Sequence, residues 1–583
     1  MKKLLVYLRP YRLQAILAPC FKLLEAAFEL LVPLIMADII DVGISSGDTA
    51  YILKKCLVLA GLGLCGFASA TCAQYFSAKA ATGATGRLRH ALFAHIQSLS
   101  YAELDRLGTA TLVTRMTSDM NQVQTGLNLT LRLLLRSPIV VFGAMIMAFT
   151  IDTRSALIFA VAIPALFAVV FAIMLSCIPL YRRVQTRLDG VTGAAQENLS
   201  GVRVIRAFAR EQTETESFAE KTGRLFSAQQ FVGRLSALLN PLTYVIINLA
   251  IVAILRVGGV RVNEGAITQG QLIALYNYMS QILVELIKFA NLILNITKSA
   301  ACAGRISQVL DTKSSMADGA GTLPDGAGTL PDGAGAPELE FRHVSFRYPQ
   351  AGADALTDIS LCAAPGETIG VIGGTGSGKS TLANLIPRFY DATEGCVLVR
   401  GKDVKSLQLQ ALRTRIGVVP QKALLFSGTI RENLRWGNAD ASDEALWDAL
   451  RAAQADGVVR DKTGQLDAPV EPGGRNFSGG QRQRLTIARA LVRRPEILIL
   501  DDSSSALDFA TDAALRKALS KLPWRPTVVL ISQRVSSIRH ADRILVLDDG
   551  RMAGLGTHAE LMSTCPVYQE ICRSQEKGEA SAS

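Results

Sequence analysis

Apolar residues are concentrated in six long stretches of the amino-terminal half of the chain. A helix needs about 20 mostly apolar residues to cross a bilayer, and each stretch reaches that length. The connections after the second and fourth stretches are long, polar and helical in pattern, whereas the others are short. Because two crossings separate the long connections, both lie on one side of the membrane. The stretches cover residues 14–42, 52–76, 131–151, 155–180, 237–260 and 270–297.

The pattern changes after residue 310. Residues 318–337 read DGAGTLP, DGAGTLP, DGAGAP, a near-repeat with too few apolar residues for a core, which predicts a linker. From ELEFRHVSFRYP onward, apolar strands alternate with helical segments, as in a parallel-sheet α/β domain. The predicted divisions are a transmembrane domain (1–310), a Gly/Ala/Pro-rich linker (311–337), an α/β domain (338–575) and a disordered tail (576–583).

Composition and charge agree with a membrane part and a soluble part. Hydrophobic residues make up 49% of the 583 residues and charged residues only 19%, which is high in apolar content for a soluble protein. The net charge of +11 alone would allow nucleic-acid binding. The basic residues, however, gather in the two long connections, which the positive-inside tendency places in the cytoplasm with both termini. The first connection carries Arg87, Arg89, Arg106, Arg115, Arg132 and Arg136. The positions of the basic residues therefore indicate the membrane topology, and no nucleic-acid partner is expected.

A phosphate-binding loop is predicted early in the α/β domain. In TIGVIGGTGSGKSTLANLI, a short apolar strand enters a glycine-rich loop that a helical segment follows, the context that G-x-x-x-x-G-K-[ST] requires. Glycines let successive backbone N–H groups converge on phosphate oxygens, and the helix N-terminus adds its positive end. We expect Lys379 to reach the β- and γ-phosphates and Ser380 to hold Mg²⁺. The expected nucleotide-binding residues are Gly373, Gly374, Thr375, Gly376, Ser377, Gly378, Lys379, Ser380 and Thr381.

Two carboxylates follow the apolar run in ILILDDSSSALD. Residues 497–500 read as a strand buried on both faces, and such strands present polar groups to ligands at their carboxyl ends. Alone, the acids could equally cap the next helix. After a phosphate loop, Asp501 is expected to be the Mg²⁺ carboxylate that P-loop sites use. The sequence thus predicts a membrane α-helical bundle of six transmembrane helices with long cytoplasmic extensions, followed by an α/β P-loop NTPase domain.

The segment NFSGGQRQRLTIARAL, residues 476–491, resembles the signature motif of ATP-binding cassette (ABC) proteins and stands just ahead of the acidic strand, as in that family. With six spans before one such domain, the chain resembles a half-transporter of the exporter type. The resemblance implies a nucleotide-binding domain over 338–575, with ATP and Mg²⁺ as cofactors. It also implies that SYAELDRLGTATLVTRMTSDMNQV and ENLSGVRVIRAFARE are coupling regions that dock on the soluble domain; solvated helical hairpins are the alternative.

The same resemblance assigns roles to individual residues. Tyr348 matches the aromatic residue that stacks on adenine, and Gln421 matches the glutamine that contacts Mg²⁺ and senses the membrane domain. Asp508 matches the aspartate of a loop that crosses the dimer interface. Strand packing for Tyr348 and a solvated turn for Gln421 are the alternatives. The residues that match the segment capping the γ-phosphate held by the opposite subunit are Ser478, Gly479, Gly480 and Gln481.

Two positions depart from the family pattern. The hydrolytic glutamate of the family is replaced by Asp502, and the switch histidine by Gln533. Asp shortens the reach of the carboxylate by about 1.5 Å, and a misplacement of about 1 Å can cost roughly a hundredfold in rate. Gln can donate a hydrogen bond to the γ-phosphate but carries no charge and exchanges no proton near neutrality. Both losses together would remove about 3 to 5 kcal/mol of transition-state stabilisation.

The intact signature motif suggests an asymmetric dimer, because such a motif serves the nucleotide of the partner. A different half-transporter would supply the Glu and the His, and this chain would hold the degenerate site, as in one subunit type of asymmetric bacterial multidrug-type exporters. The resemblance implies ATP-driven export of amphipathic compounds (a drug, lipid or peptide) across a bacterial cell membrane. A homodimer with slow ATPase activity, import of a metal chelate by the same fold, and a purely regulatory subunit remain open.

Charged residues inside the expected spans are candidates for a substrate site. Lys22 and Glu25, and likewise Glu285 and Lys288, have the spacing of same-face ion pairs, so a structural role is an equal alternative. An acidic residue that faces a cavity, Glu25 or Glu29, would favour cationic amphiphiles.

Overall fold

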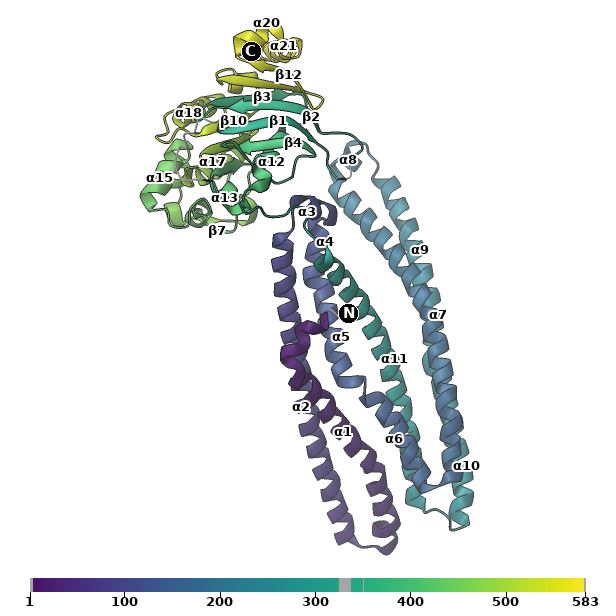
Figure 1. The fold of residues 1–583 in the computed structure, drawn as a ribbon. Coiled ribbons are helices and arrows are strands. Elements are labelled where there is room, and N and C mark those ends of the chain that lie inside the picture. Colours follow the sequence, from purple (N-terminus) through teal and green to yellow (C-terminus); the bar gives the residue numbers. More distant parts are fainter. Residues whose placement is uncertain (1–3, 324–336, 350, 581–583) are drawn as a thin grey trace. The chain divides into compact units, whose positions relative to one another are not determined.

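The structure is a computed structural model that describes residues 4–323, 337–349 and 351–580. It divides into two compact units. The helical unit contains Met1–Gln97 and Gly108–Thr312, and the α/β unit contains Ser98–Leu107 and Lys313–Ser583 (Figure 1). A short segment from the amino-terminal half therefore belongs with the carboxy-terminal half.

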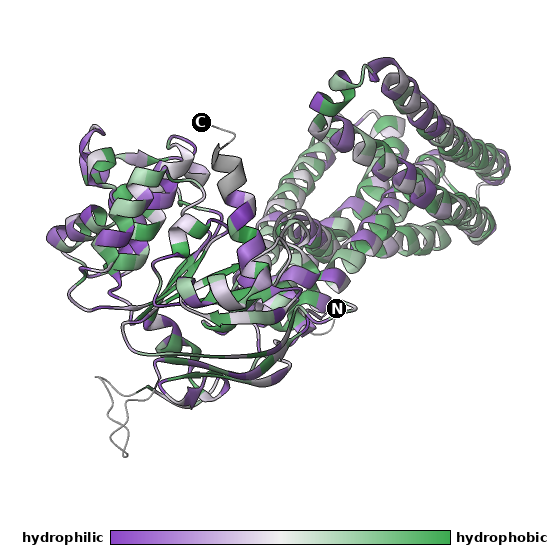
Figure 2. Cartoon of the chain, turned by 90° about the horizontal axis from the view of Figure 1, so that it is seen from above, coloured by the Kyte–Doolittle hydropathy of each residue, from purple (hydrophilic) through white to green (hydrophobic). Residues whose placement is uncertain are grey.

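The helical unit is built from long helices. Their bounds are η1 (Leu4–Tyr11), α1 (Arg12–Asp38), η2 (Ile39–Ile44), α2 (Thr49–Ser98), α4 (Thr109–Thr114), η3 (Arg115–Asp119), α5 (Met120–Leu133), α6 (Arg136–Ile151), α7 (Thr153–Ser200), α8 (Val202–Ala207), α9 (Glu211–Ala237), α10 (Leu239–Asn263) and α11 (Gln269–Asp311). Large apolar side chains are exposed along them, such as Leu64 and Val161, as lipid-facing positions require. Figure 2 shows hydrophobic residues distributed along these helices.

Five helical stretches in the described residues are long and apolar enough to cross a membrane. They are Thr49–Ser98, Thr109–Ile151, Thr153–Ser200, Glu211–Asn263 and Gln269–Asp311, and they contain the second to sixth expected spans. The first expected span, residues 14–42, is formed by α1 and η2. It is less apolar because Lys22, Glu25 and Glu29 lie within it.

Polar caps fix the ends of the membrane helices. Asp152 caps α7 by accepting from the backbone N–H of Ser155 at 2.9 Å, and Arg261 of α10 donates to the same carboxylate at 3.0 Å. Asp41 likewise accepts from the N–H of Gly270, at the start of α11. A Cβ at Gly270 would lie 2.4 Å from a carbonyl of α1, so this close crossing of α1 and α11 requires glycine.

The strands of the α/β unit form three sheets in the described residues. The first has the strand order β2-β1-β4-β5, the second β12-β11-β3-β10-β9-β6, and the third is the pair β7-β8. The strands are β1 (Leu339–Phe346), β2 (Leu356–Ala363), β3 (Thr368–Gly373), β4 (Glu394–Val399), β5 (Lys402–Asp403), β6 (Ile416–Val419), β7 (Gly428–Thr429), β8 (Pro469–Val470), β9 (Ile497–Asp501), β10 (Thr527–Ile531), β11 (Arg543–Asp548) and β12 (Arg551–Gly556). In the second sheet β3, β6, β9, β10 and β11 run parallel, so their carboxyl ends meet at one edge.

Helices surround these sheets. They are α3 (Tyr101–Leu107), α12 (Lys379–Leu385), η4 (Val404–Ser406), α13 (Leu409–Thr414), α14 (Ile430–Arg435), α15 (Asp443–Ala452), α16 (Asp456–Arg460), η5 (Gln465–Asp467), η6 (Pro472–Gly474), α17 (Gly479–Val492), α18 (Phe509–Leu519), α19 (Val535–Ile538), α20 (His558–Thr564) and α21 (Pro566–Ala580). Helix α21 runs through residues 576–580 of the expected tail, and residues 581–583 lie outside the described part.

The central strand β9 is buried on both faces, as its apolar run predicts. Ile497 and Ile499 pack in one core with the β1–β2 sheet, whereas Leu498 and Leu500 pack in a second core with α17 and α18. All four side chains are at most 1% exposed. Polar residues of β9 can therefore stand only at its carboxyl end, where Asp501 is found.

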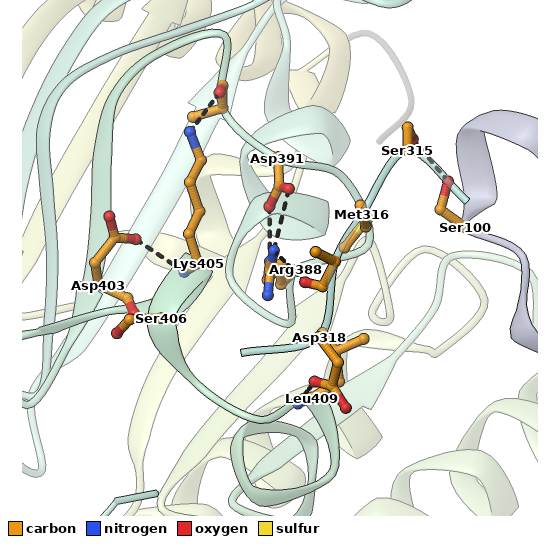
Figure 3. A network of polar contacts seen from close by, with 12 residues as sticks. Ser100, Ser315, Met316, Asp318, Arg388, Asp391, Asp403, Lys405, Ser406 and Leu409 are labelled. Carbon is orange, nitrogen blue, oxygen red and sulfur yellow. Dashed lines mark hydrogen bonds and ion pairs between the residues drawn. The ribbon is translucent and has the colours of Figure 1, made fainter. Parts of the chain in front are cut away.

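Helix α3, in the first expected coupling region, packs within the α/β unit against its carboxy-terminal part. The rings of Tyr101 and Phe389 lie 4.6 Å apart, and Tyr390 donates a hydrogen bond to Asp105. The hydroxyls of Ser100 and Ser315 lie 3.2 Å apart (Figure 3). Burial opposes ionisation of Glu103, but hydrogen bonds from Ser100 and Ser315 outweigh it and lower the pKa of that carboxyl. This segment is docked in the structure rather than solvated.

The beginning of the expected linker is also docked. Leu409 N–H donates to Asp318 at 2.7 Å, Gly321 N–H donates to the carbonyl of Ser406 at 2.9 Å, and Leu323 is buried (Figure 3). A Cβ at Gly319 would lie 2.3 Å from the oxygen of Ser406. The first copy of the repeat is thus fitted to this surface, and residues 324–336, which hold most of the other copies, lie outside the described part.

Candidate ATP site

The glycine-rich loop joins β3 to α12 in a conformation that only glycine tolerates at several positions. Gly376 and Gly378 have φ angles of 84° and 93°. A Cβ at Gly378 would lie 2.6 Å from the oxygen of Ala355, and one at Gly373 would lie 2.1 Å from the oxygen of Leu547. Gly374 has no such neighbour within 4 Å, which leaves the space beside its backbone open. The loop is therefore shaped by its glycines to present backbone N–H groups.

Lys379 and Ser380 begin helix α12 at this loop. The Nζ of Lys379 donates to the carbonyls of Gly373 and Gly374 at 2.9 and 2.6 Å. Burial lowers the pKa of Lys379, although the nearby carboxylates oppose this shift. The Ser380 hydroxyl donates to Asp501 at 3.1 Å. Burial raises the pKa of the Asp501 carboxyl, which the Ser380 hydrogen bond partly offsets.

The pair of Ser380 and Asp501 has the chemistry of a Mg²⁺ site. A hydroxyl from the loop and a carboxylate from β9 meet at one point, and Mg²⁺ prefers oxygen ligands and is held in such sites together with substrate phosphates. Asp501 is half-buried, and burial and the neighbouring charge of Asp502 disfavour its ionised form, so a bound cation would stabilise that form. These residues therefore fit the ion.

Tyr348 packs against aromatic side chains, as its alternative interpretation predicts, and lies beside the phosphate-binding helix. Its ring packs edge-on against Phe346 and Tyr390, with centroid distances of 4.8 and 5.4 Å. Its hydroxyl lies 3.1 Å from that of Thr381, in the first turn of α12. Strand packing thus fixes the ring beside the phosphate-binding helix.

The residues of the signature motif cap helix α17. The Ser478 hydroxyl accepts from the N–H of Gln481 at 3.3 Å, and the Gln481 side chain accepts from the N–H of Ser478 at 3.0 Å. A Cβ at Gly479 would have no neighbour within 4 Å, whereas one at Gly480 would lie 2.9 Å from the oxygen of Ala506. The reciprocal cap holds the helix N-terminus rigid, with its positive end directed outward.

Asp508 caps the N-terminus of helix α18 in a similar way. Its carboxylate accepts from the N–H and the hydroxyl of Thr511 at 2.8 and 2.9 Å. These two hydrogen bonds lower the pKa of Asp508. The carboxylate is consequently ionised at neutral pH and stands at an exposed helix terminus.

Asp502 is held by the two glutamines that the sequence singles out. Both side-chain amides donate to its Oδ2, Gln421 at 3.3 Å and Gln533 at 3.4 Å. The backbone of Asp502 has a φ of 46°, a conformation that Asp tolerates better than most residues. The structure therefore brings together the two departures from the family pattern and Gln421 in one polar cluster.

Comparison with known proteins decides the family. Residues 15–286 match the family model of the ABC transporter transmembrane region, and residues 356–505 match that of the ABC transporter. The chain belongs to the ABC transporter family. It is 38% identical to an uncharacterized ABC transporter ATP-binding protein of Mycobacterium tuberculosis over 572 residues (98% of this chain, 97% of that one). It is 36% identical to the uncharacterized ABC transporter ATP-binding protein YfiB of Bacillus subtilis over the full length of both chains.

Two further comparisons bear on the type of ABC transporter. The ATP-dependent lipid A-core flippase of Yersinia pestis is 29% identical over 571 residues (97% of this chain, 96% of that one). The structure of a bacterial Atm1-family ABC exporter with ATP bound superposes with a TM-score of 0.79 at 24% identity, covering 97% of this chain and 98% of the other. The expected fold class, a helical transmembrane domain followed by an α/β nucleotide-binding domain, is confirmed. The chain is a multi-pass membrane protein of the ATP-hydrolysing transporters, which function as dimers in the bilayer.

One residue of this ABC site has no signal in the sequence. Gln575, in α21, donates from its side chain to the carbonyl of Gln533 at 2.7 Å and accepts from the N–H of Val535 at 2.8 Å. It thereby braces the turn that follows β10. No motif marks it, because it acts through two backbone groups that lie far away in the sequence.

Proposed function

We propose that this chain is one subunit of an ATP-driven exporter of amphipathic compounds, and that the ATP bound by its own P-loop is held but hydrolysed slowly. One observation carries the proposal: the Asp502 carboxylate, where the family has its hydrolytic glutamate, accepts hydrogen bonds from the amides of Gln421 and Gln533. The resemblance to a lipid A-core flippase supports an amphipathic substrate such as a lipid.

The residues of the P-loop bind the nucleotide in this proposal. Backbone N–H groups of residues 373–378 and the ammonium of Lys379 bind phosphate oxygens, and Tyr348 stacks on adenine. Mg²⁺, which Ser380, Gln421 and Asp501 would hold, supplies charge neutralisation at the phosphates. Nothing in this binding requires a glutamate or a histidine, so ATP affinity is retained.

Hydrolysis needs a group that orients and activates the attacking water. The Asp502 carboxylate reaches less far than glutamate by about 1.5 Å, and an error of about 1 Å can lower a rate roughly a hundredfold. Its Oδ2 already accepts from two amides and is not free to accept from water. Gln533 cannot supply the charge of a protonated histidine at the γ-phosphate. Together these differences are worth about 3 to 5 kcal/mol of transition-state stabilisation.

The signature motif serves the other nucleotide of the dimer in our proposal. The reciprocal cap between Ser478 and Gln481 supports this role, because it keeps the N–H groups of the α17 N-terminus ordered for an anion. A different half-transporter with an intact Glu and His would then use this motif at its own ATP. The proposed assembly is a heterodimer with one hydrolytic and one degenerate site.

ATPase measurements on the purified chain test this proposal. The chain is reconstituted alone and together with a candidate partner half-transporter, and steady-state hydrolysis and sidedness of substrate accumulation are measured. We expect slow turnover by the chain alone and fast turnover by the pair. Turnover by the chain alone that equals that of the pair would favour an active homodimer, and accumulation on the nucleotide side would favour import; either result would contradict the proposal.

A further inference from the structure

In the helical unit, a cavity has charged lining residues that are mostly basic. Its volume is about 530 Å³, and it lies among α1, α2, α5, α6 and α11. Apolar side chains such as Phe67 and Leu133 form part of its wall. The charged residues of the lining are Lys22, Glu25, Arg132, Arg136 and Lys288, four cations and one carboxylate.

The cavity lies in the half of the bilayer that faces the cytoplasm. Nucleotide reaches the transporter from the cytoplasm, so the ends of the spans that continue into the long polar connections lie on that side. Lys22 is about 12 Å from the start of the first expected span and Lys288 about 14 Å from the end of the last, at 1.5 Å per helical residue. Arg132 lies at the membrane boundary itself. A hydrocarbon core is about 30 Å thick, so Lys22 and Lys288 lie near its middle, and the head group of a lipid from the inner leaflet would be drawn inward past Arg132 to reach them.

The acidic residues of this region are already paired. Arg136 is only 6% exposed and donates to Glu285 and to Glu29, both at 2.5 Å. Lys288 donates to Glu285 at 2.9 Å, and Lys22 donates to Glu25 at 2.5 Å. Arg136, which the sequence counts among the charges of the first cytoplasmic connection and which also lies in the expected span 131–151, is buried at the start of α6.

The basic residues are not fully compensated. Arg132 donates to the amide oxygen of Gln74 rather than to a carboxylate. The Nε of the buried Arg136 lies 4.0 Å from the Glu25 carboxylate but has no hydrogen-bond partner in the described part of the chain, and the Lys288 side chain is 48% exposed. Counting Arg132, the four cations face three carboxylates, so the cluster carries a surplus positive charge. In a low dielectric such a surplus attracts an anion more strongly than it would in water.

The pairing also argues against a cationic ligand. A site for cationic amphiphiles would need a carboxylate that faces the cavity without a partner. Glu29 is bound by Arg136 and is not part of the lining, and Glu25 is bound by Lys22. A cation would have to displace an internal lysine or arginine, at the cost of leaving that charge unpaired.

We propose that this cavity binds the anionic head group, a phosphate or carboxylate, of an amphiphile from the inner leaflet. Arg132 and Lys288 contact the head group directly, and the buried Arg136–Glu285–Glu29 cluster holds the surrounding helices in place. Phe67 and Leu133 contact the adjoining apolar chain. The inference rests on the proposed export of amphipathic compounds and adds the charge of the substrate to it.

Binding without nucleotide tests the inference separately from export and hydrolysis. The full-length protein is placed in nanodiscs of a zwitterionic lipid, and its affinity for a fluorescent short-chain phosphatidic acid is compared with that for the matching phosphatidylcholine. We expect phosphatidic acid to bind about tenfold more tightly, and Arg132→Gln and Lys288→Gln each to remove most of this preference. Arg182→Gln, a neutralisation of an exposed arginine in the cytoplasmic extension of α7, is the matched control.

The outcomes separate the two proposals. Equal affinity for both lipids, or a preference that survives Arg132→Gln and Lys288→Gln, would overturn the head-group site even if ATP-driven export is found. Competition by inorganic phosphate with no binding of the lipid would overturn the amphiphile part of the inference. A head-group preference that depends on both residues supports the site even if vesicles show no ATP-driven transport, a result that would count against the proposed function instead.

Discussion

The side-chain amide of Gln533 donates a hydrogen bond to Oδ2 of Asp502 across 3.4 Å. The motifs of the sequence match these two residues to the switch histidine and the hydrolytic glutamate of ABC proteins. They reach each other from the ends of neighbouring parallel strands, β10 and β9. Because they are in direct contact, the effects of replacing them should not add independently.

The first prediction is that substitutions at Asp502 and Gln533 do not act independently. We expect Asp502→Glu alone to restore little hydrolysis, because Gln533 still provides no charge at the γ-phosphate. Asp502→Glu combined with Gln533→His should raise turnover at this site by roughly a hundredfold to a thousandfold, which corresponds to about 3 to 4 kcal/mol. The measurement is single-site ATPase activity in a dimer whose other site is inactivated. Full recovery from Asp502→Glu alone would show that the two defects do not act together.

The second prediction concerns Gln575, which braces the turn carrying Gln533. Gln575→Ala removes the hydrogen bonds to the carbonyl of Gln533 and from the N–H of Val535, each worth about 1 kcal/mol net. We expect faster hydrogen exchange at Val535 and, in the Asp502→Glu, Gln533→His background, several-fold lower ATPase activity. Gln569→Ala, on the same helix, removes a hydrogen bond to Met562 only and is the control. Equal effects of both substitutions would indicate general loosening of α21.

The third prediction is a pH dependence of Mg²⁺ binding. Burial raises the pKa of the Asp501 carboxyl above the usual value, and Mg²⁺ binds only its ionised form. Affinity for Mg²⁺–ATP should therefore be highest above this raised pKa and should fall as the pH decreases towards it. The fall should begin at a higher pH than the pKa of an exposed aspartate would give. Titration with ATP at fixed Mg²⁺ from about pH 8 to about pH 5 measures the effect. Asp501→Asn should bind more weakly and without this dependence; an unchanged slope in that variant would place the titrating group elsewhere.

The arrangement of the candidate site can be predicted from the sequence where it depends on local backbone and on strand ends. The P-loop glycines, Lys379 and Ser380 follow from one motif, and Asp501 follows from the buried run of β9. Pairings between distant elements could not be predicted. The charge of Arg136 indicated a cytoplasmic position, and only the packing of α1, α6 and α11 shows that its partners are Glu29 and Glu285.

Composition also does not predict how the segment before β1 is held on the folded domain. The DGAGTLP repeat predicts a linker, but residues 318–323 pack on the α/β unit and Leu323 joins one of its cores. Their hydrogen bonds come instead from Ser406, Gln408 and Leu409, in a groove that the repeat itself does not encode. The same holds for α3, whose sequence resembles a coupling region but whose contacts with Phe389 and Tyr390 depend on the folded domain.

The fourth prediction tests the contact between α3 and the α/β unit. Tyr101→Ala removes the ring that packs 4.6 Å from Phe389. If α3 transmits nucleotide closure to the membrane helices, the variant should keep its ATP affinity but lose most of the stimulation of ATPase activity by substrate. Tyr181→Ala, at an exposed tyrosine in the extension of α7, is the control. Normal stimulation in Tyr101→Ala would show that this contact does not transmit the closure.

The fifth prediction tests the docking of the repeat. Gly319→Ala would place a Cβ 2.3 Å from the backbone oxygen of Ser406, a clash that the chain can relieve only by moving residues 318–321 off the groove. We expect faster hydrogen exchange at the Leu409 amide, which donates to Asp318, and a loss of stability of about 1 to 3 kcal/mol. Gly326→Ala makes the same change at the equivalent position of the second copy of the repeat and is the sequence-matched control. If both substitutions have the same effect, the close contact with Ser406 is not what holds this segment, and the intrinsic flexibility of the glycines would account for the change.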